Sequence, residues 1–416
     1  MARARGGGQN APVPNYIALA VPFFFTFIGM EILVARRRRV DVYRFGDSVV
    51  DIGSGIFQQI GLVFFKFALF ATYTFFWERF RLVDLSPKSP WTWVLGFLLV
   101  DFFYYWWHRL SHEVNFLWAA HVVHHSSEDY NLAVALRQSI LTPWTIQPFH
   151  LPLAVAGVPP LVLLACESFN TLYQFWIHTQ LVGKLGPLER VVNTPSLHRV
   201  HHAINPRYLD KNYGGTFMIW DRLFGTYEPE TEPPVYGLVK PLQNFNPWWA
   251  QFHYWADLWK RAARTPRLAD KARVFLKGPP YAPPGMEPFP PTPQVHPATF
   301  RKYEPEIPAA IKRYVFVHLV LVIAGATALM FFENDIALPG LAAGGALVYL
   351  SLLGWGGFFE GRRWAVPLEL ARLALIAVAA AAFTRSLPVA IAAALGAMAM
   401  AAWLLRTRPR PAMLAA

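Results

Sequence analysis

Cysteine is almost absent from this chain, because Cys166 is the single cysteine among 416 residues. This excludes an internal disulfide framework and any cysteine-based zinc or iron–sulfur site, so a bound metal would need His, Asp or Glu ligands. Charged residues are also scarce, at 15%, whereas 54% of the residues are hydrophobic. Such a composition is too apolar for an ordinary soluble domain and indicates a membrane protein.

Acidic residues are fewer than basic ones, 26 against 38, which gives a formal net charge of +12. In a soluble protein this excess would suggest a nucleic-acid partner. The sequence has no nucleic-acid-binding motif, no phosphate-binding glycine loop and no internal repeat. We therefore expect no nucleic-acid partner, and we interpret the basic excess as a mark of cytoplasmic loops.

Long apolar blocks predict an all-α, polytopic membrane protein. A helix of about 20 apolar residues crosses a bilayer core, and blocks of roughly that length recur along the chain. They lie at 17–35, 57–77, 91–107, 148–178, 315–332, 336–355, 366–383 and 387–405. The fourth is long enough for a helical hairpin around Pro159 and Pro160, so we expect eight or nine spans. The first is interpreted as a retained span, because it is longer than the apolar core of a signal peptide.

Three clusters of arginines predict the orientation of these spans. The positive-inside rule places such clusters in the cytoplasm. They are Arg36 to Arg39, then Arg362 and Arg363, then Arg406, Arg408 and Arg410. With this topology the histidine-rich segments, residues 179–312 and the C-terminus are all cytoplasmic. The expected location is a bacterial inner membrane or the endoplasmic reticulum.

The chain divides into three expected regions. Residues 1–90 form N-terminal transmembrane helices, residues 91–312 form a histidine-rich core with a cytoplasmic cap and a linker, and residues 313–416 form C-terminal transmembrane helices. In the cap, aromatic side chains at helical spacing predict an amphipathic helix in the membrane interface, with a core helix as the alternative; they are Trp248, Phe252, Trp255 and Trp259. Nine prolines between residues 278 and 297 predict an extended linker.

Histidine is concentrated in one part of the sequence. Ten of the 13 histidines lie between residues 108 and 202. Eight of them form the boxes HRLSH, HVVHH and HRVHH, and a ninth follows an apolar block in FWIHT; they are His108, His112, His121, His124, His125, His198, His201, His202 and, in the last string, His178. Residues three or four apart on a helix point in similar directions, so we expect each box to present its imidazoles to one point.

The number of these histidines predicts a dinuclear metal centre in the cap. Zinc takes four ligands and iron up to six, so nine imidazoles exceed the need of one ion. Zinc, copper and nickel also accept imidazole, and composition alone does not choose among them. Iron is preferred because the site lies at the bilayer surface, where an alkyl chain can reach it. Attack on an unreactive C–H bond needs O₂ and a redox metal, which zinc is not.

The order H-x3-H, H-x2-H-H, H-x2-H-H resembles the eight-histidine signature of the fatty acid hydroxylase and sterol desaturase superfamily of membrane di-iron oxygenases. Further strings are similar to its ether-lipid-cleaving branch, the alkylglycerol monooxygenases. These are HHSSEDYNLAVALRQS at 124–139, FWIHTQLVGKLGPLE at 175–189 and NTPSLHRVHHAINPRYLDKNYGGTFMIWDRLFGTY at 193–227. The similarity is dense from Asp101 to Glu228.

The resemblance implies a reaction and its cofactors. Two irons bound by the boxes activate O₂, and the carbon next to the ether oxygen of a 1-alkylglycerol is hydroxylated to a hemiacetal, which falls apart to an aldehyde and a glycerol derivative. Tetrahydrobiopterin is the implied electron donor. A redox protein in that role is the alternative, and it is the one protein partner that we expect in addition to a membrane lipid.

Polar residues beside the boxes are candidates for further roles. Glu128 is expected to accept a histidine N–H or to contact a pterin, with helix capping as the alternative. The catalytic candidates are Glu128, Asn131 and Asn212, and the cofactor-binding candidates are Glu128 and Tyr130. Gly214 and Gly215 are expected to permit close backbone approach. Two more groups are interpreted as structural or interfacial, namely an ion pair of Asp221 with Arg222 and a solvated or head-group-binding cluster of Arg137, Gln138 and Ser139.

Two other functions compete with an ether-cleaving monooxygenase. One is a related hydroxylase or desaturase that acts on a fatty acyl, sterol or carotenoid chain with electrons from a redox protein. The other is a membrane metal transporter or sensor, which would need ionisable residues along a path through the spans. The candidates for such a path are scattered in the sequence, namely Lys66, Glu167, Glu333, Glu369 and Arg372. We therefore expect an O₂-dependent monooxygenase whose lipid substrate reaches the site sideways from the cytoplasmic leaflet.

Overall fold

The computed structural model describes residues 16–407, and within that range the chain is helical. It contains α-helices α1 to α14 and two short 3-10 helices, η1 (Val134–Leu136) and η2 (Gly186–Arg190). The described part has no strand, only the isolated bridges Val192↔Phe217 and Ala203↔Tyr236. The predicted all-α polytopic class is confirmed.

Six of the described helices are long and apolar enough to cross a membrane. They are α1 (Tyr16–Arg38), α2 (Phe45–Phe80), α11 (Ala309–Phe331), α12 (Leu338–Phe359), α13 (Ala365–Thr384) and α14 (Leu387–Thr407). Six is fewer than the eight or nine spans that the sequence predicts. The difference lies in the expected spans at 91–107 and 148–178.

Three helices of the middle region are less apolar or shorter than these six, for physical reasons. Helix α3 (Pro90–Glu113) carries Asp101 and a run of Tyr and Trp side chains, which are less apolar than Leu or Ile. Helices α5 (Thr142–Val155) and α6 (Pro160–Trp176) have 14 and 17 residues, below the length of about 20 that a crossing needs. They form the expected hairpin, because Pro159 is extended and Pro160 begins α6.

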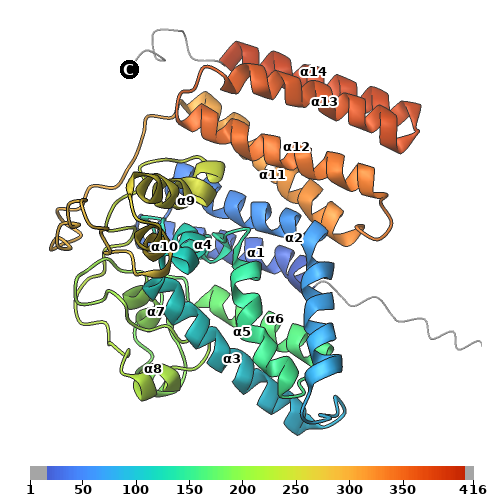
Figure 1. The fold of residues 1–416 in the computed structure, drawn as a ribbon. Coiled ribbons are helices and arrows are strands. Elements are labelled where there is room, and N and C mark those ends of the chain that lie inside the picture. Colours follow the sequence, from blue (N-terminus) through green and yellow to red (C-terminus); the bar gives the residue numbers. More distant parts are fainter. Residues whose placement is uncertain (1–15, 408–416) are drawn as a thin grey trace, which may run out of the picture.

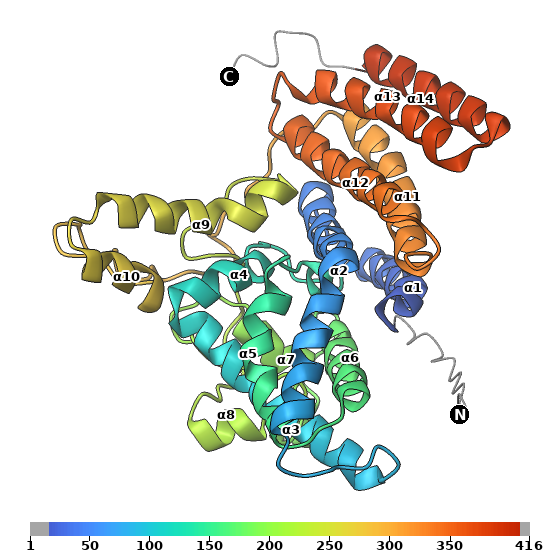
Figure 2. The same ribbon diagram turned by 45° about the vertical axis from the view of Figure 1, so that its right-hand side comes forward.

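The long helices lie side by side, and the polar segments gather at one end of them (Figure 1). That end carries α7 (Pro195–His201), α8 (Ile219–Phe224), α9 (Pro247–Arg264) and α10 (Leu268–Leu276), beside α4 (Asn115–His125). The C-terminal ends of α1, α12 and α14 point toward the same side (Figures 1 and 2). These ends carry or precede the arginine clusters, except that Arg408 and Arg410 lie outside the described residues.

The largest hydrophobic core joins the N-terminal and C-terminal helices. Side chains of α1, α2, α9, α11 and α12 meet in it, with Val50, Tyr314 and Trp355 fully buried. Charged residues in this region are paired locally. Arg372 contacts Glu369 and His318, and Lys66 pairs with Glu333. These pairs satisfy the charges within the apolar region, as a membrane protein requires.

The cap helix α9 is predicted to be either an amphipathic interface helix or a core helix, and it has features of both. Its Leu258 and Ala262 pack with Ala119 and Val274 of α4 and α10. Its other side is aromatic and open, and Trp259 is 65% exposed. The proline-rich segment after α10 contains no described helix or strand until α11, as expected for a linker.

Candidate metal centre

The nine box histidines lie at or near helix ends. His108 and His112 occupy the last turns of α3, and the second box occupies the last turns of α4. The third box fills α7 and its C-cap position, and His178 follows the end of α6 by two residues. Each of these ends is on the cap side, so four separate segments bring their imidazoles to one place. Eight of the nine side chains are buried, and His112 is nearly so.

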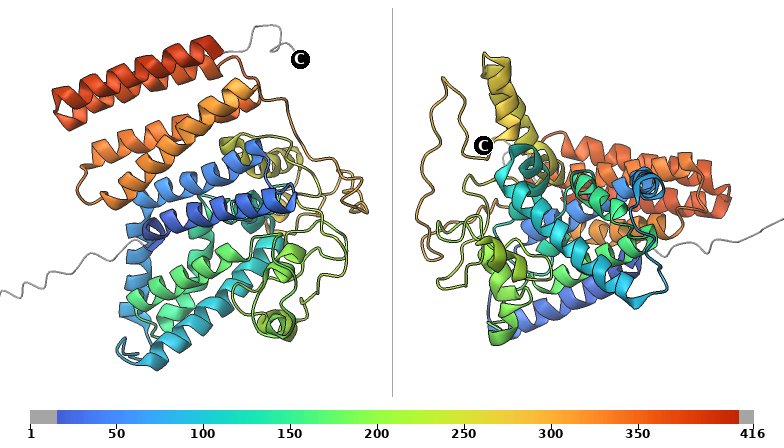
Figure 3. Two further views of the ribbon diagram at one scale, coloured as in Figure 1. Left: turned by 180° about the vertical axis from the view of Figure 1, so that it is seen from behind. Right: turned by 60° about the horizontal axis from the view of Figure 1, so that its bottom comes forward.

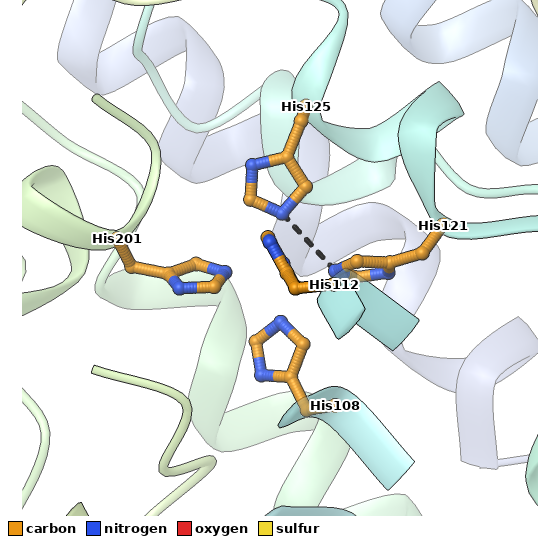
Figure 4. A group of neighbouring side chains, drawn as sticks. All are labelled: His108, His112, His121, His125 and His201. Carbon is orange, nitrogen blue, oxygen red and sulfur yellow. Dashed lines mark hydrogen bonds between the residues drawn. The ribbon is translucent and has the colours of Figure 1, made fainter. Parts of the chain in front are cut away.

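The imidazoles divide into two neighbouring groups, each with its nitrogen atoms within 4.8 Å of one another. The five-histidine group contains His108, His112, His121, His125 and His201, and Figure 4 shows these rings around a common centre. The four-histidine group contains His124, His178, His198 and His202. The groups adjoin, since the rings of His125 and His202 stack with centroids 4.4 Å apart. All nine predicted candidates are thus brought together.

The expectation that each box serves one point was wrong for two of the three boxes. In the second box, His121 and His125 belong to the five-histidine group, but His124 belongs to the other. In the third box, His198 and His202 belong to the four-histidine group, but His201 belongs to the five-histidine group. The i,i+4 pairs share a direction, and the histidine three positions along points far enough away to reach the neighbouring site.

The donor geometry of both groups fits a metal ion. In the four-histidine group the Nε2 atom of His178 lies 3.2 Å from Nε2 of His124 and 3.0 Å from Nε2 of His198. Ligand nitrogens around a metal with bonds of about 2.1 Å are about 3.0–3.4 Å apart. In the five-histidine group the buried Nε2 atoms of His108, His112 and His201 have no hydrogen-bond partner. Buried lone pairs without partners are costly, and a cation would satisfy them.

Main-chain carbonyl oxygens orient four of the rings. The Nδ1 atoms of His108, His201, His124 and His178 lie 2.6–3.1 Å from the carbonyls of Tyr213, Lys211, Arg137 and Gln174. An Nδ1–H that donates to a carbonyl leaves the Nε2 lone pair free for a metal, which is the usual arrangement around metal-bound histidine. These acceptors escaped sequence reasoning because any residue carries a carbonyl, so no residue type signals them.

Burial keeps the imidazoles neutral. It lowers the pKa of His124 to about 4 and that of His201 to about 3. The pKa values of His121, His125 and His198 are lowered by burial too, and repulsion from neighbouring imidazolium charges adds to this effect. The neutral imidazole is the form that binds a metal.

Metal-free protein is expected to lose thermal stability as pH falls from 7.5 to 5.5, and to do so more steeply than a metal-free His201→Gln variant. A histidine that is neutral in the fold takes up its proton on unfolding. Its contribution to the unfolding free energy is therefore present above the unfolded pKa of about 6.5 and falls by up to about 1.4 kcal/mol per pH unit below it.

Buried carboxyls act in the opposite direction, since burial raises the pKa of Asp221 to about 6. Comparing the parent with the variant cancels their effect. Thermal unfolding of chelator-treated protein at both pH values measures the difference, and equal pH slopes for the two proteins would contradict it.

The predicted polar residues around the boxes lie beside the histidines but are engaged elsewhere. Glu128 accepts a bond from the backbone N–H of Tyr303 at 2.6 Å and lies 3.5 Å from Arg44. Asn131 bonds the carbonyl of Val42, and Asn212 bridges the carbonyls of Leu197 and Glu228. The expected bond from a histidine to Glu128 is not among these contacts. The three side chains hold loops of the core in place.

Tyr130 is the one of these candidates that touches the histidines. Its ring stacks on His178 with centroids 5.7 Å apart, and it lies 5.2 Å from His202. Its hydroxyl donates to the carbonyl of Ile177, and Tyr236 covers its other face at 4.9 Å. Tyr130 therefore forms a wall of the four-histidine group.

Arg137 has a role that neither interpretation of its sequence anticipated. It is buried, and it donates to Asp47 and Asp51 at 3.0 and 2.9 Å and to the carbonyl of Val123. A solvated or head-group role is excluded by this burial. Because its own carbonyl contacts His124, this ion network lies directly behind the four-histidine group.

The expected ion pair of Asp221 with Arg222 does not form. Asp221 is buried and accepts bonds from the backbone of Tyr213 and Gly214. Arg222 instead lies over the ring of Tyr227 at 3.7 Å. Asp221 therefore secures the loop whose Tyr213 carbonyl orients His108. The close approach expected at Gly214 is confirmed, since an added Cβ would lie 2.4 Å from the Phe217 carbonyl oxygen.

An apolar cavity of about 410 Å³ ends at the histidines. Both groups border it, through His121 on one side and His124 and His178 on the other. Most of its wall comes from apolar side chains of α1, α2, α5, α6 and α11. Polar side chains interrupt the apolar surface, notably the amides of Gln58, Gln138 and Gln174, and the charged residues Lys66 and Glu167 also border it. An elongated apolar molecule with a small polar part fits this lining.

Comparison with known proteins identifies the family. Residues 93–226 match the family model described as fatty acid hydroxylase. The chain is 40% identical over 368 residues to alkylglycerol monooxygenase of Xenopus tropicalis, covering 87% of this chain and 81% of that protein. The chain belongs to the alkylglycerol monooxygenase family. It is a membrane oxidoreductase, a monooxygenase of the fatty acid hydroxylase superfamily, and at this level the predicted function is confirmed.

Two further alkylglycerol monooxygenases extend the comparison. The Homo sapiens protein is 46% identical over 272 residues, which cover 65% of this chain and 61% of that protein. The Danio rerio protein is 37% identical over 367 residues, which cover 88% of this chain and 82% of that protein. No solved structure matches the chain. The match to family members thus extends well beyond the histidine core into the flanking helices.

Proposed function

We propose that this protein cleaves the ether bond of alkylglycerol lipids by hydroxylating the carbon next to the ether oxygen. The observation that carries the proposal is the apolar cavity that ends on two adjoining groups of buried histidines. The names of the similar proteins support the choice of substrate. A relative of the superfamily that uses a fatty acid or a sterol is the alternative.

We assign one iron to each histidine group. Two irons bound there would supply the oxidising chemistry with O₂ that C–H hydroxylation needs. One oxygen atom of O₂ enters the C–H bond and the other leaves as water, with two electrons and two protons from an external reductant. The resulting hemiacetal then breaks its C–O bond to give an aldehyde and a free glycerol hydroxyl.

The chain's own residues bind and orient the lipid. The alkyl chain lies along the apolar wall of the cavity, away from water. The glycerol hydroxyls face the amides near the histidine end. Gln174 is well placed there, because its carbonyl contacts His178 while its side chain bonds Tyr104 and Asn170. Fixed contacts on the head group hold the ether carbon, rather than any other, at the histidines.

Tetrahydrobiopterin is the proposed electron donor, on the strength of the family resemblance. Glu128 and Tyr130, its expected contacts, are occupied by Tyr303 and by neighbouring rings. Other residues therefore bind the pterin, or a redox protein supplies the electrons in its place. Oxygen uptake with alkylglycerol, measured with the pterin and then with a ferredoxin system, separates the two donors.

The histidine groups and the cap are proposed to lie on the cytoplasmic side. The support is that the arginine-bearing ends of α1, α12 and α14 lie at the cap end of the molecule (Figure 1). In a Cys166-free background, Ser86→Cys should react with an impermeant thiol reagent added outside, and Ala298→Cys should not. Both positions are exposed, and the reverse labelling pattern would invert the orientation.

Head-group chemistry is expected to control turnover more than chain length does. An alkyl chain gains little on moving from the bilayer to an apolar cavity, although it gains about 0.8 kcal/mol per CH₂ on leaving water. Changing the chain by two carbons should therefore alter turnover modestly, whereas a phosphocholine in place of a free glycerol hydroxyl should lower it by about tenfold or more. Turnover of a free fatty acid or sterol, with none of alkylglycerol, would favour the alternative.

A further inference from the structure

A second apolar space lies on the outside of the helix bundle, between α1 and α6. It has a volume of about 730 Å³. The residues of α1 that line it recur at spacings of three and four and so occupy one face of the helix; they include Leu19, Phe23, Phe27, Met30 and Val34. Leu19, Phe23, Phe27 and Met30 are 48–65% exposed. Helices α1 (dark blue) and α6 (green) lie alongside each other when the molecule is seen from behind (Figure 3).

This outer groove and the inner cavity meet at two side chains. Phe24 of α1 and Phe175 of α6 line both spaces, and no other described residue does. Their ring centroids are 4.6 Å apart. Phe175 is 8% exposed, and Phe24 is half-buried. The two rings form the partition between the lipid-facing surface and the space that ends at the histidines.

The polar groups of the groove lie at its cap end and are already engaged. Glu31 accepts bonds from Tyr43, Thr179 and the backbone N–H of Leu132. Arg38 donates to the carbonyl of Leu181 at 2.9 Å. The rest of the lining is apolar, so the groove offers nothing to a polar ligand along its length. In a bilayer its surroundings are hydrocarbon chains, which match this surface.

We propose that the groove is the lateral access path for the substrate and that Phe24 and Phe175 form its gate. The occupant is the alkyl chain of a membrane lipid, because the groove is apolar, faces the bilayer and continues into the cavity at the histidines. That the lipid is an alkylglycerol rests on the proposed function; the path itself does not. Passage requires a change of side-chain rotamer, because the two rings pack against each other between the groove and the cavity.

Cross-linking across the gate tests this path. A Phe24→Cys, Phe175→Cys double variant in a Cys166→Ala background is placed in lipid nanodiscs and bridged with a short bifunctional methanethiosulfonate, which a reductant cleaves. The probe is an alkylglycerol with a diazirine at the end of its chain. After illumination, mass spectrometry locates the label either on α5, whose Ile146 borders the inner cavity, or on the outer face of α1.

Bridging is expected to lower labelling of α5 by about fivefold or more, and reduction should restore it, while labelling of α1 persists. Labelling of α5 that bridging leaves unchanged would overturn the gate. The readout needs no turnover, so it stands apart from the proposed function. A different result is that the unbridged protein does not oxidise alkylglycerol while bridging still lowers labelling of α5. That result would contradict the substrate assignment and support the access path.

A second test uses substrate shape. Phe24→Ala should raise the turnover of a methyl-branched alkylglycerol relative to a straight-chain one by about threefold or more, because the opening is wider. Phe23→Ala is the matched control, since Phe23 is the adjacent groove residue but does not border the inner cavity. The ratio of the two substrates is insensitive to a general loss of stability. Equal ratios in both variants would overturn the gate.

Discussion

Replacing His124 or His201 by alanine is expected to remove bound metal and to lower turnover by about a hundredfold or more. Each side chain belongs to a different histidine group, and each has its Nδ1 held by a carbonyl so that Nε2 faces its group. The effects on metal content should differ. His124→Ala leaves three ligands in its group, whereas His201→Ala leaves four, so the first should lose its ion more completely.

Elemental analysis of the purified variants, together with oxygen uptake, measures both effects. The parent should hold close to two irons per chain. His296→Ala is the matched control, because this exposed histidine lies in the proline-rich linker, and it should retain both metal and activity. Full iron occupancy in His124→Ala and His201→Ala would refute the assignment of these residues as ligands.

Replacing Arg137 by methionine is expected to lower the free energy of unfolding by about 3–5 kcal/mol. The guanidinium is 1% exposed and contacts Asp47 and Asp51, which are 2% and 0% exposed. Asp47 keeps its ion pair with Arg44 in the variant, but Asp51 loses its charge partner. An unpaired carboxylate in the apolar interior is far costlier than the pair it came from.

Thermal unfolding in detergent, followed by fluorescence, reports this loss. Adding Asp51→Asn to Arg137→Met should recover part of the lost stability, because it removes the uncompensated charge. Arg207→Gln is the control, since Arg207 forms an exposed pair with Glu228 and its loss should leave the unfolding temperature unchanged. A similar unfolding temperature for Arg137→Met and Arg207→Gln would show that the buried network contributes little.

The sequence by itself determined the parts of this protein that depend on local geometry. Histidines at spacings of three and four share a helix face, so the boxes could be identified as candidate ligands without knowledge of the fold. The paired prolines at 159 and 160 predicted the α5–α6 hairpin because proline ends one helix and begins the next. The long apolar blocks predicted the six helices that are long and apolar enough to cross a membrane, since hydrophobic length is a local property.

Tertiary structure decided how these local units are shared between sites. Spacing within a box turns His124 away from His121, and His201 away from His198, but which histidines of other segments each one joins depends on where α3, α4, α6 and α7 dock. Arg137 pairs with carboxylates of α2 that lie 86 and 90 residues away in the sequence. Glu128 accepts a hydrogen bond from the backbone N–H of Tyr303, which follows the linker. Such pairings arise because a buried charge or N–H must be satisfied by whatever group folding brings near it, and that choice is made by packing rather than by sequence proximity.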